Sequence, residues 1–186
     1  MTADEAFETL LTAVQRGDEA AAAALYRRVQ PRLVRYLRFE EPQAADDIAA
    51  DVWVAIAAKI GDFEGGEDGF RAWAFTIARR RVIDHRRRGM RRRTSSASPE
   101  SFVDRADHTD GSDPSSSLDS QDAVDRIVAL LPPVQAEVVL LRVVADLDAE
   151  TVARMLGRSA NWVRVTQHRA LKKLAEQLRR PTDVTP

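Results

Sequence analysis

Five side chains near the C-terminus repeat at helical spacing: Asn161, Arg164, Val165, His168 and Lys172 occupy positions i, i+3, i+4, i+7 and i+11. At this spacing they share one face of a helix. Arginine can bond guanine with two hydrogen bonds, asparagine prefers adenine, and valine can contact the methyl group of thymine. The pattern therefore favours a helix that contacts base edges in the major groove of DNA. The alternative is a solvated helix whose basic residues are stabilised near its C-terminus by the helix dipole.

The residues before this helix predict a helix-turn-helix. Gly157 suits a turn or a left-handed cap, and Ser159 is a good N-cap for the helix that follows. The first helix should bury three apolar residues on one face, namely Val152, Ala153 and Leu156. The buried stripe of the second helix is expected to consist of Val163, Ala170, Leu171 and Leu174.

The charges of the chain are strongly segregated, although its net charge over 186 residues is only -1. Residues 1–70 are acidic, with 14 Asp and Glu against 7 Lys and Arg. Residues 71–93 contain ten arginines against Asp84 alone, and residues 154–180 contain eight basic residues against Glu176 alone. Two basic stretches of this kind indicate a nucleic-acid partner in spite of the near-neutral sum.

Composition and spacing disfavour several classes of protein. The chain has no cysteine and therefore no disulfide or thiolate metal site. It lacks the roughly 20-residue apolar run of a membrane span, and its acidic start does not resemble a signal peptide, so we expect a cytoplasmic protein without membrane insertion. The histidines are scattered, and the helical pattern unites no nucleophile with a base. We expect no enzyme activity, no cofactor and no metal.

A glycine-rich loop at residues 61–69 ends a predicted helix. Its acidic residues are spaced somewhat like a calcium loop, but Trp73 stands at position twelve, where such a loop has Glu. Glycines allow a backbone to approach an unpaired base closely, and Phe63 could stack on that base. An acidic side chain of the loop could accept a hydrogen bond from cytosine N4.

The helical patterns predict an all-α protein of two small domains. A helical bundle is expected over residues 1–93 and a helix-turn-helix domain over residues 118–186. Residues 94–117, rich in Ser, Asp, Pro and Gly, are typical of a flexible acidic linker. Pro31 is expected to kink or restart the second helix. Trp73 is expected in the core, whereas Phe75 lies off the apolar stripe.

Four segments resemble the bacterial extracytoplasmic-function (ECF) sigma factors. They are ADDIAADVW (45–53), FRAWAFTIARRRVIDHRRR (70–88), LLPPVQAEVVLLRVV (130–144) and VRVTQHRALKKL (163–174). The second segment is the most specific, and the resemblance covers almost the whole chain. It implies an alternative sigma factor, which binds core RNA polymerase and directs transcription initiation by recognising minus-10 and minus-35 promoter elements.

The resemblance also assigns residues to promoter DNA. The helix-turn-helix would recognise duplex minus-35 DNA through Arg158, Ser159, Asn161, Trp162, Arg164, Val165, His168, Arg169 and Lys172. The glycine-rich loop and the arginine-rich helix would open and bind the minus-10 element through Phe63, Glu64, Gly65, Gly66, Arg71, Arg79, Arg80, His85 and Arg86. This chain departs from the family at Arg80, where Asn is frequent, and at Arg86 and Gln167, where Leu is frequent.

Protein partners are implied in the same way. An acidic helix would dock on the clamp helices of the largest polymerase subunit through Asp46, Asp47, Ile48, Asp51 and Trp53, although Ala50 and Asp51 replace the usual Gln and Glu. The C-terminal domain would contact the flap of the second largest subunit. An anti-sigma factor is expected to inhibit the protein. The acidic linker would either follow the active-site cleft and RNA exit path of the polymerase or act as an inert tether.

Two other interpretations remain open. A stand-alone helix-turn-helix regulator would bind paired half-sites as a dimer, which explains residues 118–180 but gives the arginine-rich helix and the loop no role. A protein-binding adaptor would predict that changes at Arg164 and His168 leave transcription unaffected.

Overall fold

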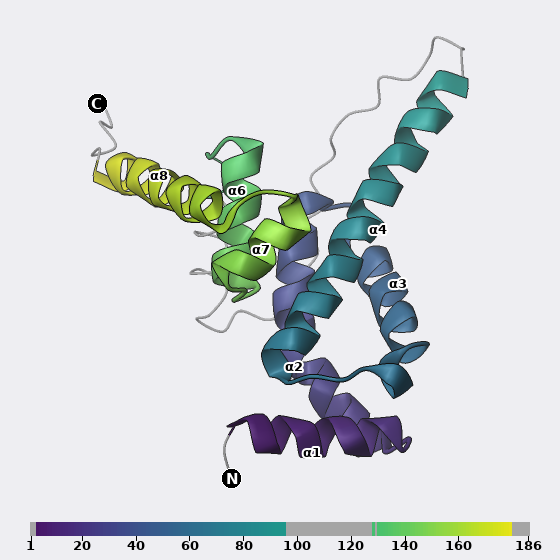
Figure 1. The fold of residues 1–186 in the computed structure, drawn as a ribbon. Coiled ribbons are helices and arrows are strands. Elements are labelled where there is room, and N and C mark those ends of the chain that lie inside the picture. The colour runs from purple at the N-terminus through teal and green to yellow at the C-terminus, as the bar shows by residue number, and fades with distance from the viewer. Residues whose placement is uncertain (1–2, 96–127, 129, 180–186) are drawn as a thin grey trace, which may run out of the picture.

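The computed structural model describes residues 3–95, 128 and 130–179, and within these ranges it is helical without a strand, which confirms the predicted all-α fold (Figure 1). The N-terminal unit consists of α1 (Ala3–Gln15), α2 (Glu19–Glu40), α3 (Ala45–Ala57), the short η1 (Ile60–Asp62) and α4 (Glu67–Ser95). The C-terminal unit consists of α6 (Pro133–Val139), the π-helical η2 (Leu140–Val144), α7 (Ala149–Leu156) and α8 (Ala160–Arg179). No helix in the described ranges is long and apolar enough to cross a membrane. Most of the predicted linker 94–117 lies outside the described residues.

Helix α2 packs against α1, α3 and α4 and organises the N-terminal unit. Its start is capped by Asp18, whose carboxylate accepts a 2.8 Å hydrogen bond from the backbone N–H of Ala21. The expected restart at Pro31 does not occur, because the helix continues through this residue. Pro31 is exposed, so the backbone hydrogen bond that it removes lies on the solvent side, while buried residues before and after it hold the helix against its neighbours.

Helix α4 is enclosed over its N-terminal half by α1, α2 and α3. Because several neighbours surround it, α4 buries more than one stripe of side chains, and the expectation that Phe75 lies off the apolar face is wrong. Phe75 is 0% exposed, and its ring meets that of Tyr36 edge-on with centroids 5.5 Å apart. Trp73 packs partly buried against the core, as predicted.

The turn of the predicted helix-turn-helix is confirmed. Gly157 ends α7 in the left-handed conformation with φ 64°. The hydroxyl of Ser159 accepts a 3.1 Å hydrogen bond from the backbone N–H of Trp162 at the start of α8. The expected stripe of α8 is confirmed at Val163, Ala170 and Leu174, which are buried, but it is wrong at Leu171, which is 45% exposed.

The two units pack against each other through α2 and α4 on one side and α6, η2 and α7 on the other. Helix α2 contacts η2, and Figure 1 shows α6 and α7 beside the middle of α4 while α8 extends away from it. This arrangement leaves the second helix of the helix-turn-helix on the outside of the molecule.

Candidate nucleic-acid interface

Helix α8 presents the predicted reading face to solvent. Asn161, Arg164, His168, Arg169 and Lys172 are all exposed. Val165 lies among them and is 39% exposed. This combination offers hydrogen-bond donors, one apolar contact and positive charge on a single helical face, which matches what direct readout in the major groove requires.

Three contacts shape the N-terminal end of this reading face. The guanidinium of Arg158 lies over the ring of Trp162, 5.4 Å from its centroid, and Ser159 is occupied as the helix cap. Arg164 forms an ion pair with Glu150 on α7. Both side chains of this pair are more than half exposed, so solvent screens the attraction and a competing acceptor can replace the carboxylate.

The polar residue Gln167, which stands where an apolar one is usual, has a specific partner. Arg142 on η2 donates a hydrogen bond from Nε to Oε1 of Gln167 at 3.0 Å. The same guanidinium donates to the backbone carbonyl of Leu147. Arg142 therefore connects α8 with η2 and with the segment that precedes α7. The sequence did not reveal this contact, because 25 residues separate Arg142 from Gln167.

The glycine-rich loop is held by the rest of the N-terminal unit. The ring of Phe63 stacks on Trp73 at 5.0 Å and meets Phe70 edge-on at 5.5 Å. The side-chain amide of Gln15 donates to the carbonyls of Ile60 and Phe63, both at 2.9 Å. In this arrangement one face of the Phe63 ring stacks on Trp73, while the residue remains partly exposed.

The tip of the loop remains open. Glu64 and Gly65 are exposed and Gly66 is half-buried. Gly65 has a φ of 140°, a backbone conformation that residues other than glycine rarely adopt. The aromatic rings hold the loop in place, and the backbone at its tip is open. This arrangement suits the close approach of a nucleotide.

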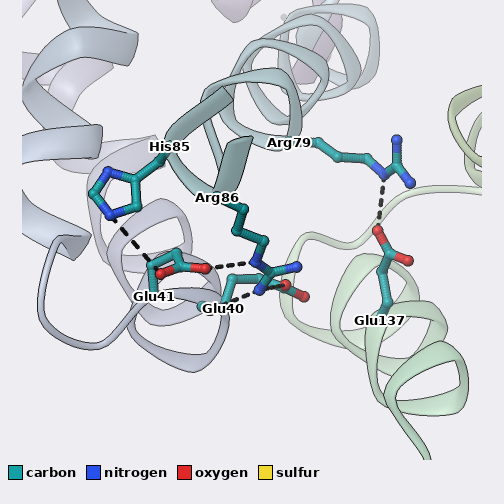
Figure 2. Close-up of polar contacts among 6 residues, drawn as sticks. All are labelled: Glu40, Glu41, Arg79, His85, Arg86 and Glu137. Carbon is teal, nitrogen blue, oxygen red and sulfur yellow. Dashed lines mark hydrogen bonds and ion pairs between the residues drawn. The ribbon is translucent and has the colours of Figure 1, made fainter. Parts of the chain in front are cut away.

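The predicted minus-10 residues on α4 diverge in direction, and Figure 2 shows three of them meeting acidic partners. Arg79 donates from Nε to Glu137 of α6 at 2.8 Å. Arg86 donates to the carboxylates of Glu40 and Glu41, at 2.8 and 2.5 Å. Nε2 of His85 lies 4.0 Å from Glu41. The three residues thus face the end of α2 and the C-terminal unit.

The acidic and hydroxyl groups beneath Arg86 lie in a poorly solvated region. Burial raises the pKa of the Tyr36 hydroxyl well above its usual range, and nearby carboxylates raise it further. Burial also raises the pKa of the Glu40 carboxyl, although Arg86 acts in the opposite direction. In this conformation the guanidinium of Arg86 therefore forms ion pairs within the protein, with Glu40 and Glu41.

An outer basic face of α4 contains Arg80, Arg81, Arg87 and Arg88. Arg80, Arg87 and Arg88 are exposed, and Arg81 lines a shallow hollow with Arg87, Arg88, Asp84 and Arg91. Arg71 differs, because only 12% of its side chain is exposed and it is paired with Asp68 and with Asp146 of the C-terminal unit. Of the predicted minus-10 arginines, Arg80 is thus presented to solvent, whereas Arg71, Arg79 and Arg86 contact acidic residues.

The acidic face of α3 is open to solvent. Asp46, Asp47 and Asp51 are exposed. Ile48 lies in the core at 3% exposure and so supports this face rather than forming part of it. Trp53 is partly buried and donates a 2.6 Å hydrogen bond to Gln30, with its ring 5.0 Å from that of Tyr26. Tyr26 is 43% exposed and extends the face beyond the residues predicted from sequence.

Comparison with known proteins identifies the class. A family model described as ECF sigma factor matches residues 4–180. The ECF RNA polymerase sigma factor ShbA of Streptomyces griseus is 34% identical over 167 residues, which cover 85% of this chain and 87% of ShbA. SigD of Mycobacterium tuberculosis, also an ECF RNA polymerase sigma factor, is 29% identical over 181 residues, which cover 94% and 84% of the two chains.

Solved structures show the same fold. The sigma factor RpoE of Bartonella quintana, in a complex with the anti-sigma factor NepR, superposes with a TM-score of 0.61 at 25% identity over 84% of this chain and 95% of RpoE. CnrH, in complex with the cytosolic domain of CnrY, superposes with a TM-score of 0.60 at 22% identity over 95% and 97% of the two chains. The chain belongs to the ECF sigma factor family. It is an alternative sigma factor, and its partner is core RNA polymerase. A stand-alone regulator is not favoured.

Proposed function

We propose that the two units divide promoter recognition between them. The C-terminal unit binds duplex minus-35 DNA with the exposed face of α8, and the N-terminal unit opens and holds the minus-10 element with the glycine-rich loop and α4. The observation that carries this proposal is the reading face itself. Asn161, Arg164 and His168 project into solvent from a helix whose start is fixed by a left-handed glycine and a serine cap.

The N-terminal unit also docks on core polymerase in this proposal. Its acidic α3 face, with Asp46, Asp47 and Asp51 exposed, meets the clamp helices of the largest subunit. The C-terminal unit contacts the flap of the second largest subunit. The segment between the units, residues 94–117, is proposed as the acidic connection between these two docking points.

The protein itself performs no chemical step in this mechanism. It supplies binding free energy that offsets the cost of unstacking a base, which is a few kcal/mol. We propose that it acts in the cytoplasm, where its polymerase partner lies, and that an anti-sigma factor restrains it, as the complex of RpoE with NepR illustrates for a relative.

Run-off transcription tests the function directly. The chain is mixed with core polymerase and with fragments of the host genome, and discrete transcripts are expected only when both proteins are present. Log affinity for promoter DNA should fall linearly with log salt, with a slope of about -0.9 for each phosphate contact on duplex DNA. Transcripts that form equally well without the chain, or a salt response that is flat, would contradict the proposal.

A further inference from the structure

A cavity of about 300 Å³ lies between α4 and α7, two helices that Figure 1 shows beside each other. Cavities that hold small ligands measure roughly 300–1,000 Å³ and combine apolar walls with a few convergent polar groups. The cavity between α4 and α7 has both kinds of wall, and its volume lies at the lower end of this range. It is therefore a candidate site for a small molecule.

Three arginines form the polar wall of the cavity. Arg79 and Arg80 come from α4, and Arg154 comes from α7. Nε of Arg79 donates to Glu137 at 2.8 Å (Figure 2), which leaves its two terminal nitrogens for another acceptor. Arg80 and Arg154 are exposed, and neither forms an ion pair within the part of the chain that the structure describes. The cavity therefore favours an anion.

Hydrogen bonds hold Arg154 in place at the cavity. Its Nη2 donates to the hydroxyl of Thr151 at 2.8 Å, and this hydroxyl donates to the carboxylate of Asp148 at 2.9 Å. Thr151 is only 6% exposed, and Asp148 is fixed as the cap of α7. An arginine that is already positioned loses less conformational freedom when it binds an anion.

The apolar wall contains Ala72, Trp73 and Met155. Trp73 and Met155 are partly buried and pack against the core. The indole of Trp73 is held from one side by Phe63, which stacks on it at 5.0 Å. Aromatic rings and the planar guanidinium of arginine both hold nucleobases by stacking. An inorganic anion would leave this wall of the cavity unused.

The two walls together match one chemical class. A phosphate monoester offers arginine anionic oxygens for paired hydrogen bonds, and a base offers a flat apolar surface. We propose that this cavity binds a nucleoside monophosphate, with the phosphate on Arg79, Arg80 and Arg154 and the base against Trp73. The monophosphate is chosen because it is the smallest nucleotide. Arg154 belongs to neither of the proposed promoter-binding surfaces, so this site does not depend on promoter recognition.

Isothermal titration calorimetry on the full chain tests the site. The probe is AMP, and inorganic phosphate and adenosine are titrated separately. AMP should bind at one site and about tenfold more tightly than inorganic phosphate, because only AMP can stack a base. Adenosine should bind at least about tenfold more weakly than AMP, because it lacks the charged acceptor. Absence of saturable AMP binding would overturn the site, and equal affinity for AMP and either of the other two would overturn the nucleotide.

Substitutions on both helices test whether α4 and α7 share the ligand. Arg80→Gln and Arg154→Gln should each weaken AMP binding about tenfold, because each removes charged hydrogen bonds to the phosphate. Arg87→Gln on α4 and Arg169→Gln on α8 are the matched controls, since they remove exposed arginines that do not line the cavity. They should weaken binding by less than about twofold, because salt screens distant charges.

Circular dichroism checks that all four variants fold, which is expected because all four arginines are exposed. Equal weakening in all four would indicate a general attraction of anions and overturn the site. Weakening in only one of the two cavity variants would place the anion on a single helix and overturn the shared site.

Tryptophan fluorescence tests the position of the base. The chain has three tryptophans, and a base that stacks on Trp73 should quench part of their emission. AMP should therefore quench the original chain, and the quenching should be lost in Trp73→Phe, which keeps an aromatic ring in the wall. Quenching that persists in this variant would overturn the placement of the base. Failure of run-off transcription would remove the proposed function but would leave these binding results unchanged.

Discussion

Arg142 on η2 donates a 3.0 Å hydrogen bond to the side-chain carbonyl of Gln167 on α8. Gln167 stands at a position that faces the interior of the helix-turn-helix, where its polar group needs a partner. The pair supplies this partner and fixes the rotation of α8 relative to η2, and with it the direction of the reading face. The orientation of the side chains proposed to contact DNA therefore depends on a residue two elements away.

Gln167→Ala is expected to lower the free energy of unfolding by about 1 kcal/mol, because Arg142 then loses one acceptor in a partly buried place. Thermal unfolding followed by circular dichroism measures the effect. His168→Ala removes the neighbouring exposed side chain and should change stability by less than about 0.5 kcal/mol. Equal stability of the two variants would show that the contact is unimportant.

Arg164→Ala is expected to weaken binding to duplex minus-35 DNA by about 1–3 kcal/mol and to relax the preference at one base pair, because the proposed bidentate contact to a base would be lost. Lys172→Ala should weaken binding similarly on all sequences and reduce the salt slope by about one phosphate contact. Fluorescence anisotropy distinguishes the two variants. It is measured with the promoter found by run-off transcription and with single-base variants of that promoter. A uniform loss in the Arg164 variant would argue against base recognition.

Asp148 caps α7 by accepting a 2.7 Å hydrogen bond from the backbone N–H of Thr151, and this bond holds the pKa of its carboxyl below the usual range. Asp148→Ala should cost about 1 kcal/mol of stability. Because the folded pKa is lowered, the contribution is present above the unfolded value of about 3.9 and is lost as the pH falls through the folded value.

The difference in unfolding free energy between Asp148→Ala and the original chain should therefore be constant near neutral pH and shrink in strong acid. Denaturant unfolding at a series of pH values measures it. Glu176→Ala, which removes an exposed carboxylate, is the matched control for this difference. A difference that persists unchanged at the most acidic pH would contradict the charged cap.

Gly65→Ala should destabilise the glycine-rich loop by at least about 1 kcal/mol, because its φ of 140° strains any residue with a Cβ. The added Cβ would also lie 3.4 Å from the ring of Phe63. Gly66→Ala, whose nearest neighbour would be Asp4 at 3.6 Å, is the matched control without this strain. Promoter opening, measured with permanganate, should fall more in the Gly65 variant than in the control.

Charge reversal of Asp47 and Asp51 to Lys should weaken binding to core polymerase by about tenfold or more, since like charges across an interface are strongly unfavourable. Glu8→Lys on α1 makes a similar change of charge away from the acidic face and should have little effect. Competition with a labelled copy of the original chain for core polymerase provides the measurement. Equal loss in all variants would indicate a general effect of net charge.

Local signals in the sequence predicted the elements well. Gly157 and Ser159 marked the turn because a left-handed cap and a serine cap each follow from the residue itself. Pro31 does not restart the helix, because packing on both sides outweighs one lost hydrogen bond, and the predicted kink stays a prediction. The prediction that Phe75 lies off the apolar face was wrong, because a helix with three neighbours buries more than one stripe of side chains.

The sequence alone could not identify the partners of the charged residues. Spacing placed Arg79 and Arg86 on one helical face but did not indicate what that face meets. Glu137 lies 58 residues from Arg79, and Glu41 lies 45 residues from Arg86, so only the tertiary arrangement unites them. The assignment of these residues to DNA therefore stays a prediction, and their contacts in the free protein depend on the packing of the two units.

Helix α4 runs without interruption from Glu67 to Ser95, so the last three residues of the predicted loop 61–69 are already helical. At 1.5 Å per residue these 29 residues span about 43 Å, the length of about 13 base pairs of duplex. A continuous helix cannot stretch to follow DNA. Its N-terminal half is enclosed by α1, α2 and α3, so the exposed arginines at and beyond its middle, Arg80, Arg87 and Arg88, are held at fixed distances from the glycine-rich loop.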